Sequence, residues 1–446
     1  MNEMKGQELT SHPVDEMLPF SKLFAYGLQH VLAMYAGAVA VPIIIAQALQ
    51  LTPAQLIHLI NADLFTCGIA TLIQTIGFWK VGARIPMIQG VTFAAVTPMI
   101  LIGTEHGITA IYGAIIVAGL LTFLVAPYFS KLIRLFPPVV TGTIITIIGI
   151  TLLPVAVRWI GGGNPKAPDF ASPMQLMLAG LTLCIVIVVY RYAKGFLSNI
   201  AVLIGLIGGT VASILLGQAN FAEVGRADWI SVTTPFSFGF PTFDVGSVIS
   251  MVIVMLVVMV ETTGDSIAIG EIVGKPIGRD GLARCLRADG LSTFIGGILN
   301  SFPYTAFAQN VGLVAVTRVK SRFVVAASGV ILILLGLFPK MAAVVACIPN
   351  AVLGGAGLAM FGMIIASGVR ALSKVQFEGN YNLMLVAISI GMSMITLTIP
   401  NFFQHFPDVA KIVLQSGITL GSITAVLLNL IFNGMGDPHE DTTSPK

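Results

Sequence analysis

The sequence predicts an all-α polytopic membrane protein with fourteen transmembrane segments. Of its 446 residues, 56% are hydrophobic and only 10% are charged, whereas about 25% are charged in a typical soluble domain. The apolar residues form separate runs, most of them near the length of about 20 residues that a helix needs to cross the hydrocarbon core. Lys and Arg concentrate in alternate connections between the runs, as expected for a chain that crosses a membrane repeatedly.

The fourteen predicted segments divide into two sets of seven. The first set is 22–49, 54–78, 85–103, 108–129, 133–156, 173–190 and 195–216, and the second is 245–273, 285–300, 302–316, 321–339, 341–368, 380–400 and 412–434. The connection 218–244 is the longest and contains a Pro-, Phe- and Gly-rich string, so it is the natural boundary between two halves.

The tenth segment, 302–316, is the unusual one. Its uncharged run has only 15 residues, with Pro303 near the start, the carboxamide pair Gln309 and Asn310 in the middle and Gly312 just after. Backbone that interrupts a helix at membrane depth is tolerated where it is buried in protein or lines a cavity, and transporters bind substrate at such breaks. This stretch is therefore predicted to bind a small, polar, planar ligand.

The two halves resemble each other in the order of their features. The third segment of the first half, with 90–98, is as irregular as the third of the second half, and 136–142 aligns with 348–354 at Pro, Val and Gly. Because seven is odd, the second copy enters from the opposite side of the membrane. This predicts a 7+7 inverted repeat, with short extended strands in segments 3 and 10 meeting near the midplane.

The charge distribution predicts that both termini are cytoplasmic. Eighteen of the 23 Lys and Arg residues lie on the side that holds both ends of the chain, as the positive-inside rule requires of the cytosolic face. Residues 1–18 are then a cytosolic leader without the pattern of a removable signal, and 435–446 are a cytosolic tail.

The eighth segment carries two carboxyl groups inside the membrane. Glu261 and Asp265 are four residues apart and lie on one helical face, and an acid at a helix centre is a functional candidate because of its insertion cost. Repulsion and burial both disfavour ionisation, so one of the two is expected to carry a proton. The alternative is that both are paired structurally with other helices.

Four further ionisable groups lie within the predicted segments. Asp289 is either functional or a helix-end or salt-bridge residue near the cytosolic end of segment 9. His30 lies mid-segment and is either a proton carrier or a satisfied interior group. Asp63 and Glu271 lie toward segment ends, where structural roles are expected.

Several function classes lack a signature in this sequence. There is no GxxxxGK[ST] phosphate loop, HExxH or CxxC, so neither ATP-driven transport nor a zinc enzyme is indicated. The net charge of +3 is too small to indicate nucleic-acid binding. The four cysteines are expected to be buried small side chains rather than a disulfide or metal site.

The residues 309–318 fit the signature Q-N-x-G-x-x-x-x-T-[RKG] of the nucleobase-ascorbate transporter family. Other stretches resemble bacterial xanthine and uric acid permeases of that family, and the likeness runs from about Pro19 to Gly434: 27–30, 91–95, 261–265, 288–290 and 353–357. The resemblance implies a core domain (19–132 and 245–340) and a gate domain (133–244 and 341–434). It also implies an elevator-type movement, usually in a homodimer in the cell membrane, and symport of a nucleobase with H⁺ as the coupling ion and no other cofactor.

The resemblance also assigns roles to individual residues. The glutamate and the glutamine that bind the base in this family match Glu261 and Gln309. The predicted substrate site also includes Asn310 and Ala308, which flank Gln309, and Phe93 and Thr92 of the third segment. Proton coupling falls on Glu261, supported by Asp265, Asp289 and His30. A carboxylate accepts N–H bonds, a carboxamide both donates and accepts, and Phe93 could stack on a purine ring.

The substrate is expected to be an oxidised purine. Uracil permeases of this kind carry glutamate at the position of Gln309, so the glutamine favours the purine branch. Asp265 resembles xanthine carriers, whereas long stretches outside the site resemble uric acid carriers, and both substrates stay open. The alternatives are a uracil or other nucleobase permease, an anion exchanger or channel of the same architecture, and a membrane-embedded enzyme.

Overall fold

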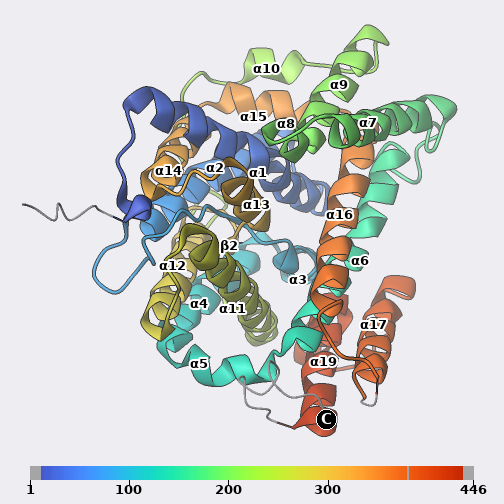
Figure 1. The fold of residues 1–446 in the computed structure, drawn as a ribbon. Helices are drawn as coiled ribbons and strands as arrows, with labels where there is room; N and C mark the ends of the chain where they lie inside the picture. The colour runs from blue at the N-terminus through green and yellow to red at the C-terminus, as the bar shows by residue number, and fades with distance from the viewer. Residues whose placement is uncertain (1–11, 379–380, 435–446) are drawn as a thin grey trace, which may run out of the picture.

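The computed structural model describes residues 12–378 and 381–434. The first part of the expected leader and the whole of the expected tail, 435–446, lie outside the described residues. Within these limits the chain is mostly helical (Figure 1). Seven helices are long and apolar enough to cross a membrane, or up to nine if each of two bent pairs is counted as one span.

The first half of the chain consists mainly of α-helices, with one short strand. They are α1 (Phe20–Ala48), α2 (Pro53–Ile76), β1 (Gln89–Val91), α3 (Val96–His106), α4 (Ile108–Val125), α5 (Phe129–Leu132), α6 (Pro138–Ile160), α7 (Pro173–Tyr192), α8 (Phe196–Asn199), α9 (Ala201–Leu215) and α10 (Ala222–Arg226).

The second half has a similar order of long and short elements, without a counterpart of α10. They are α11 (Val245–Val273), α12 (Arg279–Ile298), β2 (Tyr304–Ala306), α13 (Ala308–Thr317), α14 (Arg322–Gly336), α15 (Pro339–Ala346), α16 (Asn350–Leu372), α17 (Asn382–Thr398), α18 (Asp408–Gln415) and α19 (Gly417–Asn433).

Some predicted segment boundaries are wrong. Segment 12 was expected at 341–368, but α15 is a separate short helix bent by 81° from α14, and the long helix α16 starts at Asn350. Likewise α6 starts at Pro138 instead of residue 133. The two helices start alike, because Pro137 and Pro349 are their N-cap residues; a proline there lacks only an N–H that would be unpaired in any case.

The helices form two bundles. The first bundle contains α1–α4 and α11–α14, where α2 packs on α14 and α4 packs on α12. The second contains α6, α7, α9, α16, α17 and α19, where α6 packs on α16, α7 on α9, and α17 on α19. In Figure 1 the first bundle occupies the left of the view, and α6, α16, α17 and α19 stand on the right.

Glycines allow the closest helix contacts inside the first bundle. A Cβ on Gly68 of α2 would lie 2.4 Å from the carbonyl oxygen of Gly329 in α14, and one on Gly119 of α4 would lie 2.5 Å from the amide nitrogen of Phe294 in α12. Small residues let helix backbones approach closely in membranes, where dispersion contacts stabilise helix packing.

We expect Gly119→Val to lower the thermal unfolding midpoint of the purified protein strongly. The new side chain would meet backbone atoms of α12, which can yield only if the helices separate, so the loss should reach the upper end of the roughly 1–3 kcal/mol typical of overpacking. The control is Gly391→Val on α17, where an added Cβ would meet no atom within 4 Å. Equal midpoints for the two variants would contradict this packing.

The two short strands lie at the centre of the first bundle. β1 and β2 pair antiparallel, with Gly90 opposite Thr305, and every strand residue is buried. Position 90 must be a glycine, because a Cβ there would lie 2.3 Å from the ring of Phe307. The pair brings the starts of the short helices α3 and α13 together, from opposite halves of the chain.

The cysteines of the described residues are all free. Cys67 and Cys285 are buried and Cys347 is partly buried, as expected, but Cys184 is exposed on α7. The expectation of burial is wrong for Cys184 because α7 lies at the outside of the second bundle and presents an apolar face there.

Candidate functional site

Glu261 lies on α11 where the first bundle meets the second. Its side chain is half-buried and lines a narrow crevice together with Val257 and Val260 of the same helix and Thr141, Ile144 and Ile145 of α6. Asp265 is also half-buried, one turn further along α11. The predicted acidic pair therefore lies on one face of a long helix, and Glu261 faces the other bundle.

Thr262 connects α11 to the broken stretch. Its hydroxyl accepts a hydrogen bond from the amide of Ala306 at 3.1 Å and lies 3.2 Å from the hydroxyl of Thr305. These bonds hold α11 against β2, while the preceding residue, Glu261, lies beside α6. The sequence did not indicate this anchoring role of Thr262, because its partners lie more than forty residues away.

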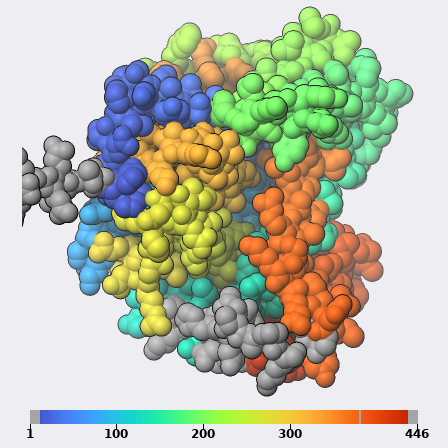
Figure 2. Space-filling model, viewed as in Figure 1, coloured from blue at the N-terminus to red at the C-terminus, as the bar shows by residue number. Residues whose placement is uncertain are grey.

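The start of α13 presents two predicted substrate residues to solvent. Ala308 and Gln309 are exposed, whereas Asn310 is buried. Within the described part of the chain, the Gln309 side chain makes no hydrogen bond, so both its donor and its acceptor are free for a ligand. In the space-filling view α13 reaches the surface between the blue N-terminal segment and the yellow helices α11 and α12 (Figure 2).

Asn310 and His30 form a buried pair. The Asn310 amide nitrogen donates to the backbone oxygen of His30 at 2.9 Å and lies 3.0 Å from the His30 Nδ1 atom. His30 is on α1, so this pair joins α1 to α13 behind Gln309. The role of Asn310 in substrate binding stays a prediction, and its Oδ1 atom has no partner among the described residues.

Phe93 lies between the two bundles as well. Its ring meets Phe361 of α16 edge to face, with 6.0 Å between the centroids, and its own neighbour Thr92 caps the following turn by accepting from the Ala94 amide. Phe361 was not singled out by the sequence, because one aromatic residue in a long apolar helix resembles any other until the fold brings it to the site.

Two buried acids, Asp289 and Asp63, lie deeper inside their helices than the sequence analysis expected. Asp289 lies near the middle of α12, fully buried, and within the described residues it has no salt-bridge partner, so the helix-end and salt-bridge interpretation is wrong. Asp63 was expected toward a segment end in a structural role, but it lies in the middle of α2 and is fully buried. It accepts hydrogen bonds from Tyr304 at 2.9 Å and Ser301 at 3.3 Å, which ties α2 to β2. Glu271 is exposed near the end of α11, as expected.

Glu261, Gln309 and Phe93 therefore come from α11, from α13 and from the turn before α3, and α11 contacts both of the other two segments. That these three side chains bind a ligand together stays a prediction. Within the described residues no group of three or more His, Cys, Asp or Glu side chains could hold a metal ion.

Known proteins resemble this chain over most of its length. The sequence model of a permease family matches residues 21–402. The uric acid transporter UacT of Escherichia coli is 48% identical over 433 residues, covering 96% of this chain and 90% of that protein. A xanthine permease of Bacillus subtilis is 45% identical over 414 residues, covering 93% of this chain and 94% of that protein.

Among solved structures, the transmembrane domain of the cyanobacterial bicarbonate transporter BicA matches with a TM-score of 0.62. It covers 93% of this chain and 100% of that domain at 16% identity, which indicates a shared fold only. The family match and the two close relatives, together with the signature 309–318, identify the protein: the chain belongs to the nucleobase-ascorbate transporter family and is a multi-pass membrane transporter, not an enzyme.

Proposed function

We propose that this protein is a proton-coupled symporter that imports an oxidised purine, xanthine or uric acid. The observation that carries the proposal is that a half-buried carboxyl, Glu261, and an exposed carboxamide, Gln309, lie on two segments that the hydrogen bond from Ala306 to Thr262 links. The names of the two relatives, a uric acid transporter and a xanthine permease, support the substrate class.

The ligand chemistry fits these side chains. An oxidised purine presents alternating N–H donors and C=O acceptors around a flat edge. Glu261 would accept from N–H groups, while Gln309 would donate to a carbonyl and accept from a neighbouring N–H. Phe93 would stack on the ring, and Thr92, Ala308 and Asn310 would shape the remaining contacts.

Proton coupling is assigned to Glu261 first. It is the acid that faces both the ligand and the other bundle, so gaining a proton would change how it binds the purine. Asp265, Asp289 and His30 are the supporting groups, and the buried pair of His30 with Asn310 would connect α1 to the binding helix.

The finer architecture that we propose is fourteen spans in a 7+7 inverted repeat. It is supported by helix pairs that recur in both halves: α2 packs on α14 as α12 packs on α4, and α7 packs on α9 as α17 packs on α19. In this arrangement β1 with α3 and β2 with α13 are the two broken segments.

The transport movement that we propose is of the elevator type. The first bundle, the core domain, would carry substrate past the second bundle, the gate domain. A polar contact between them supports two separable bodies: Gln47 of α1 accepts from the Trp159 indole N–H of α6 at 2.5 Å and donates to Asn350 of α16 at 2.7 Å. A homodimer in the cell membrane with both termini in the cytosol completes the proposal.

The rival function is anion transport, because the bicarbonate transporter shares the fold. Glu261 and Asp265 would repel an anion if ionised, which favours the purine. A uracil permease is the second rival, disfavoured by glutamine at position 309.

The test is uptake of labelled xanthine and of labelled uric acid into cells that lack their own purine carriers. Each substrate is measured with and without a protonophore, and with excess unlabelled uracil. We expect uptake that collapses with the protonophore and ignores uracil, with the ratio of the two rates giving the preferred substrate. Uptake of neither purine, or uptake indifferent to the proton gradient, would overturn the proposal.

A further inference from the structure

An open pocket of about 250 Å³ lies away from the purine site, where the chain enters α1 and where α13 turns into α14. Three cationic side chains line it, Lys22, Arg318 and Lys320, together with Tyr26, Leu18 and a single carboxylate, Glu16. Residues from both halves of the chain contribute, so the pocket exists only in the folded protein.

The positive charge in this pocket is not neutralised by neighbouring acids. Among the described residues, none of the three cations has a carboxylate within 4.0 Å. The nearby Asp15 is already occupied, because Arg322 binds it at 2.6 Å and Lys275 lies 3.9 Å away. Three cations against one carboxylate leave a net positive pocket suited to an anion.

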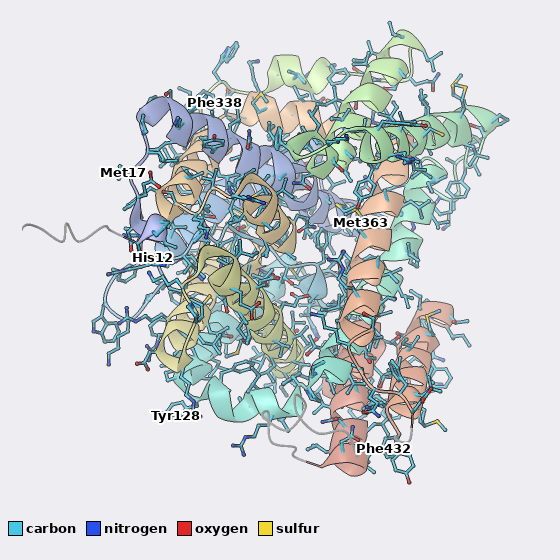
Figure 3. The ribbon with its side chains drawn as sticks, viewed as in Figure 1. His12, Met17, Tyr128, Phe338, Met363 and Phe432 are labelled. Atoms are coloured by element: carbon cyan, nitrogen blue, oxygen red, sulfur yellow. The ribbon has the colours of Figure 1, made fainter. Side chains whose placement is uncertain are left out.

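The segment that leads into the pocket also exposes apolar side chains. Met17, Phe20 and Phe24, which surround Lys22 in the sequence, are 63%, 81% and 50% exposed, and Met17 lies at the outer edge of the molecule (Figure 3). In a membrane transporter such side chains contact lipid. A ligand that joins an anionic group to hydrocarbon would satisfy the cations of the pocket and its apolar lining residues, Leu18 and Val319.

We propose that this pocket binds the phosphate group of an anionic phospholipid, with the acyl chains leaving past the apolar lining residues Leu18 and Val319. Basic pockets between transmembrane helices attract anionic headgroups in this way, and the Tyr26 hydroxyl adds a donor. The site would also stabilise the binding helix, because Arg318 caps the C-terminal end of α13 in a left-handed conformation with φ of 58°. Gln309 lies at the other end of that helix.

The test measures lipid binding directly on the purified full-length protein, by native mass spectrometry with phosphatidylglycerol and with phosphatidylcholine. We expect the wild type to prefer phosphatidylglycerol. The double variant Lys22→Gln/Lys320→Gln should bind phosphatidylglycerol about 30-fold more weakly, from the attraction of each basic residue to anionic lipid. The matched control, Lys194→Gln/Lys374→Gln, removes two exposed cations elsewhere and should bind like the wild type.

Two further arms separate the possible outcomes. Unfolding midpoints without added lipid should be equal in both double variants, which excludes misfolding as the cause. Inorganic phosphate at the same concentration should not displace the lipid; displacement would mean that the pocket recognises free phosphate and would overturn the lipid assignment. No preference for phosphatidylglycerol, or equal weakening in the control variant, would also overturn it. Binding is read without purine uptake, so the proposed transport function can fail independently.

Discussion

Replacing Glu261 with glutamine is expected to lower proton-dependent purine uptake about 100-fold. Hydrogen bonds to a charged group are worth about 1.5–3 kcal/mol, which corresponds to roughly 10- to 150-fold in affinity. Glutamine also cannot take up a proton, so the variant should lose the stimulation of uptake by an imposed pH gradient. Initial rates in membrane vesicles, with and without such a gradient, measure both effects.

The control for this variant is Glu271→Gln. It makes the same chemical change on the same helix, but its side chain is exposed at the far end of α11, so both the rate and the response to the gradient should stay at the wild-type level. A Glu261→Gln variant that still accumulates purine when the pH gradient is imposed would show that another group couples the proton. Asp265 and Asp289 would then be the next candidates.

Replacing Gln309 with glutamate should also lower xanthine and uric acid uptake about 100-fold. The amide donor would be lost, and a purine carbonyl would face a carboxylate oxygen. A binding site built to hydrogen-bond its substrate rejects a mismatched partner by as much as 10⁴–10⁵ in favourable cases. The Michaelis constant should rise more than the maximal rate falls, because the lost hydrogen bond stabilises the bound substrate in the ground state as much as in the transition state.

The control here is Gln218→Glu, which introduces the same charge at an exposed position outside the described hydrogen bonds of the site. It should leave both kinetic parameters unchanged. If Gln309→Glu keeps the wild-type affinity for both purines, then Gln309 does not contact the base, although it is free and exposed in the structure. Competition by uracil in this variant would further indicate that position 309 selects between base classes.

The sequence carried most of the information about the binding stretch. The signature 309–318 predicted the family, which the comparisons confirm. The spacing of Glu261 and Asp265 alone placed both acids on one face of a helix, because helical periodicity is a local property of the chain. The positions of these residues in the transport cycle stay predictions, to be tested by the variants above.

The sequence did not predict which side chains meet across the boundary between the two bundles. Phe361 reaches Phe93, and Gln47 reaches Trp159 and Asn350, over separations of more than a hundred residues, and no local pattern distinguishes these side chains from their neighbours. Asp63 illustrates the same limit. Its place in the predicted segment suggested a position toward the segment end, but the side chain is buried by contacts with Tyr304 and Ser301, which come from the other half of the chain.

By itself, then, the sequence determined the membrane class, the family and the chemical identity of the binding stretch, since composition, periodicity and a contiguous motif are all local. Only the tertiary structure decided which acids are buried, what Glu261 faces and that Lys22 joins Arg318 and Lys320 in one pocket. The physical reason is that burial and pairing depend on how helices from the two halves pack, and the pairing of β1 with β2 brings those halves together at the site.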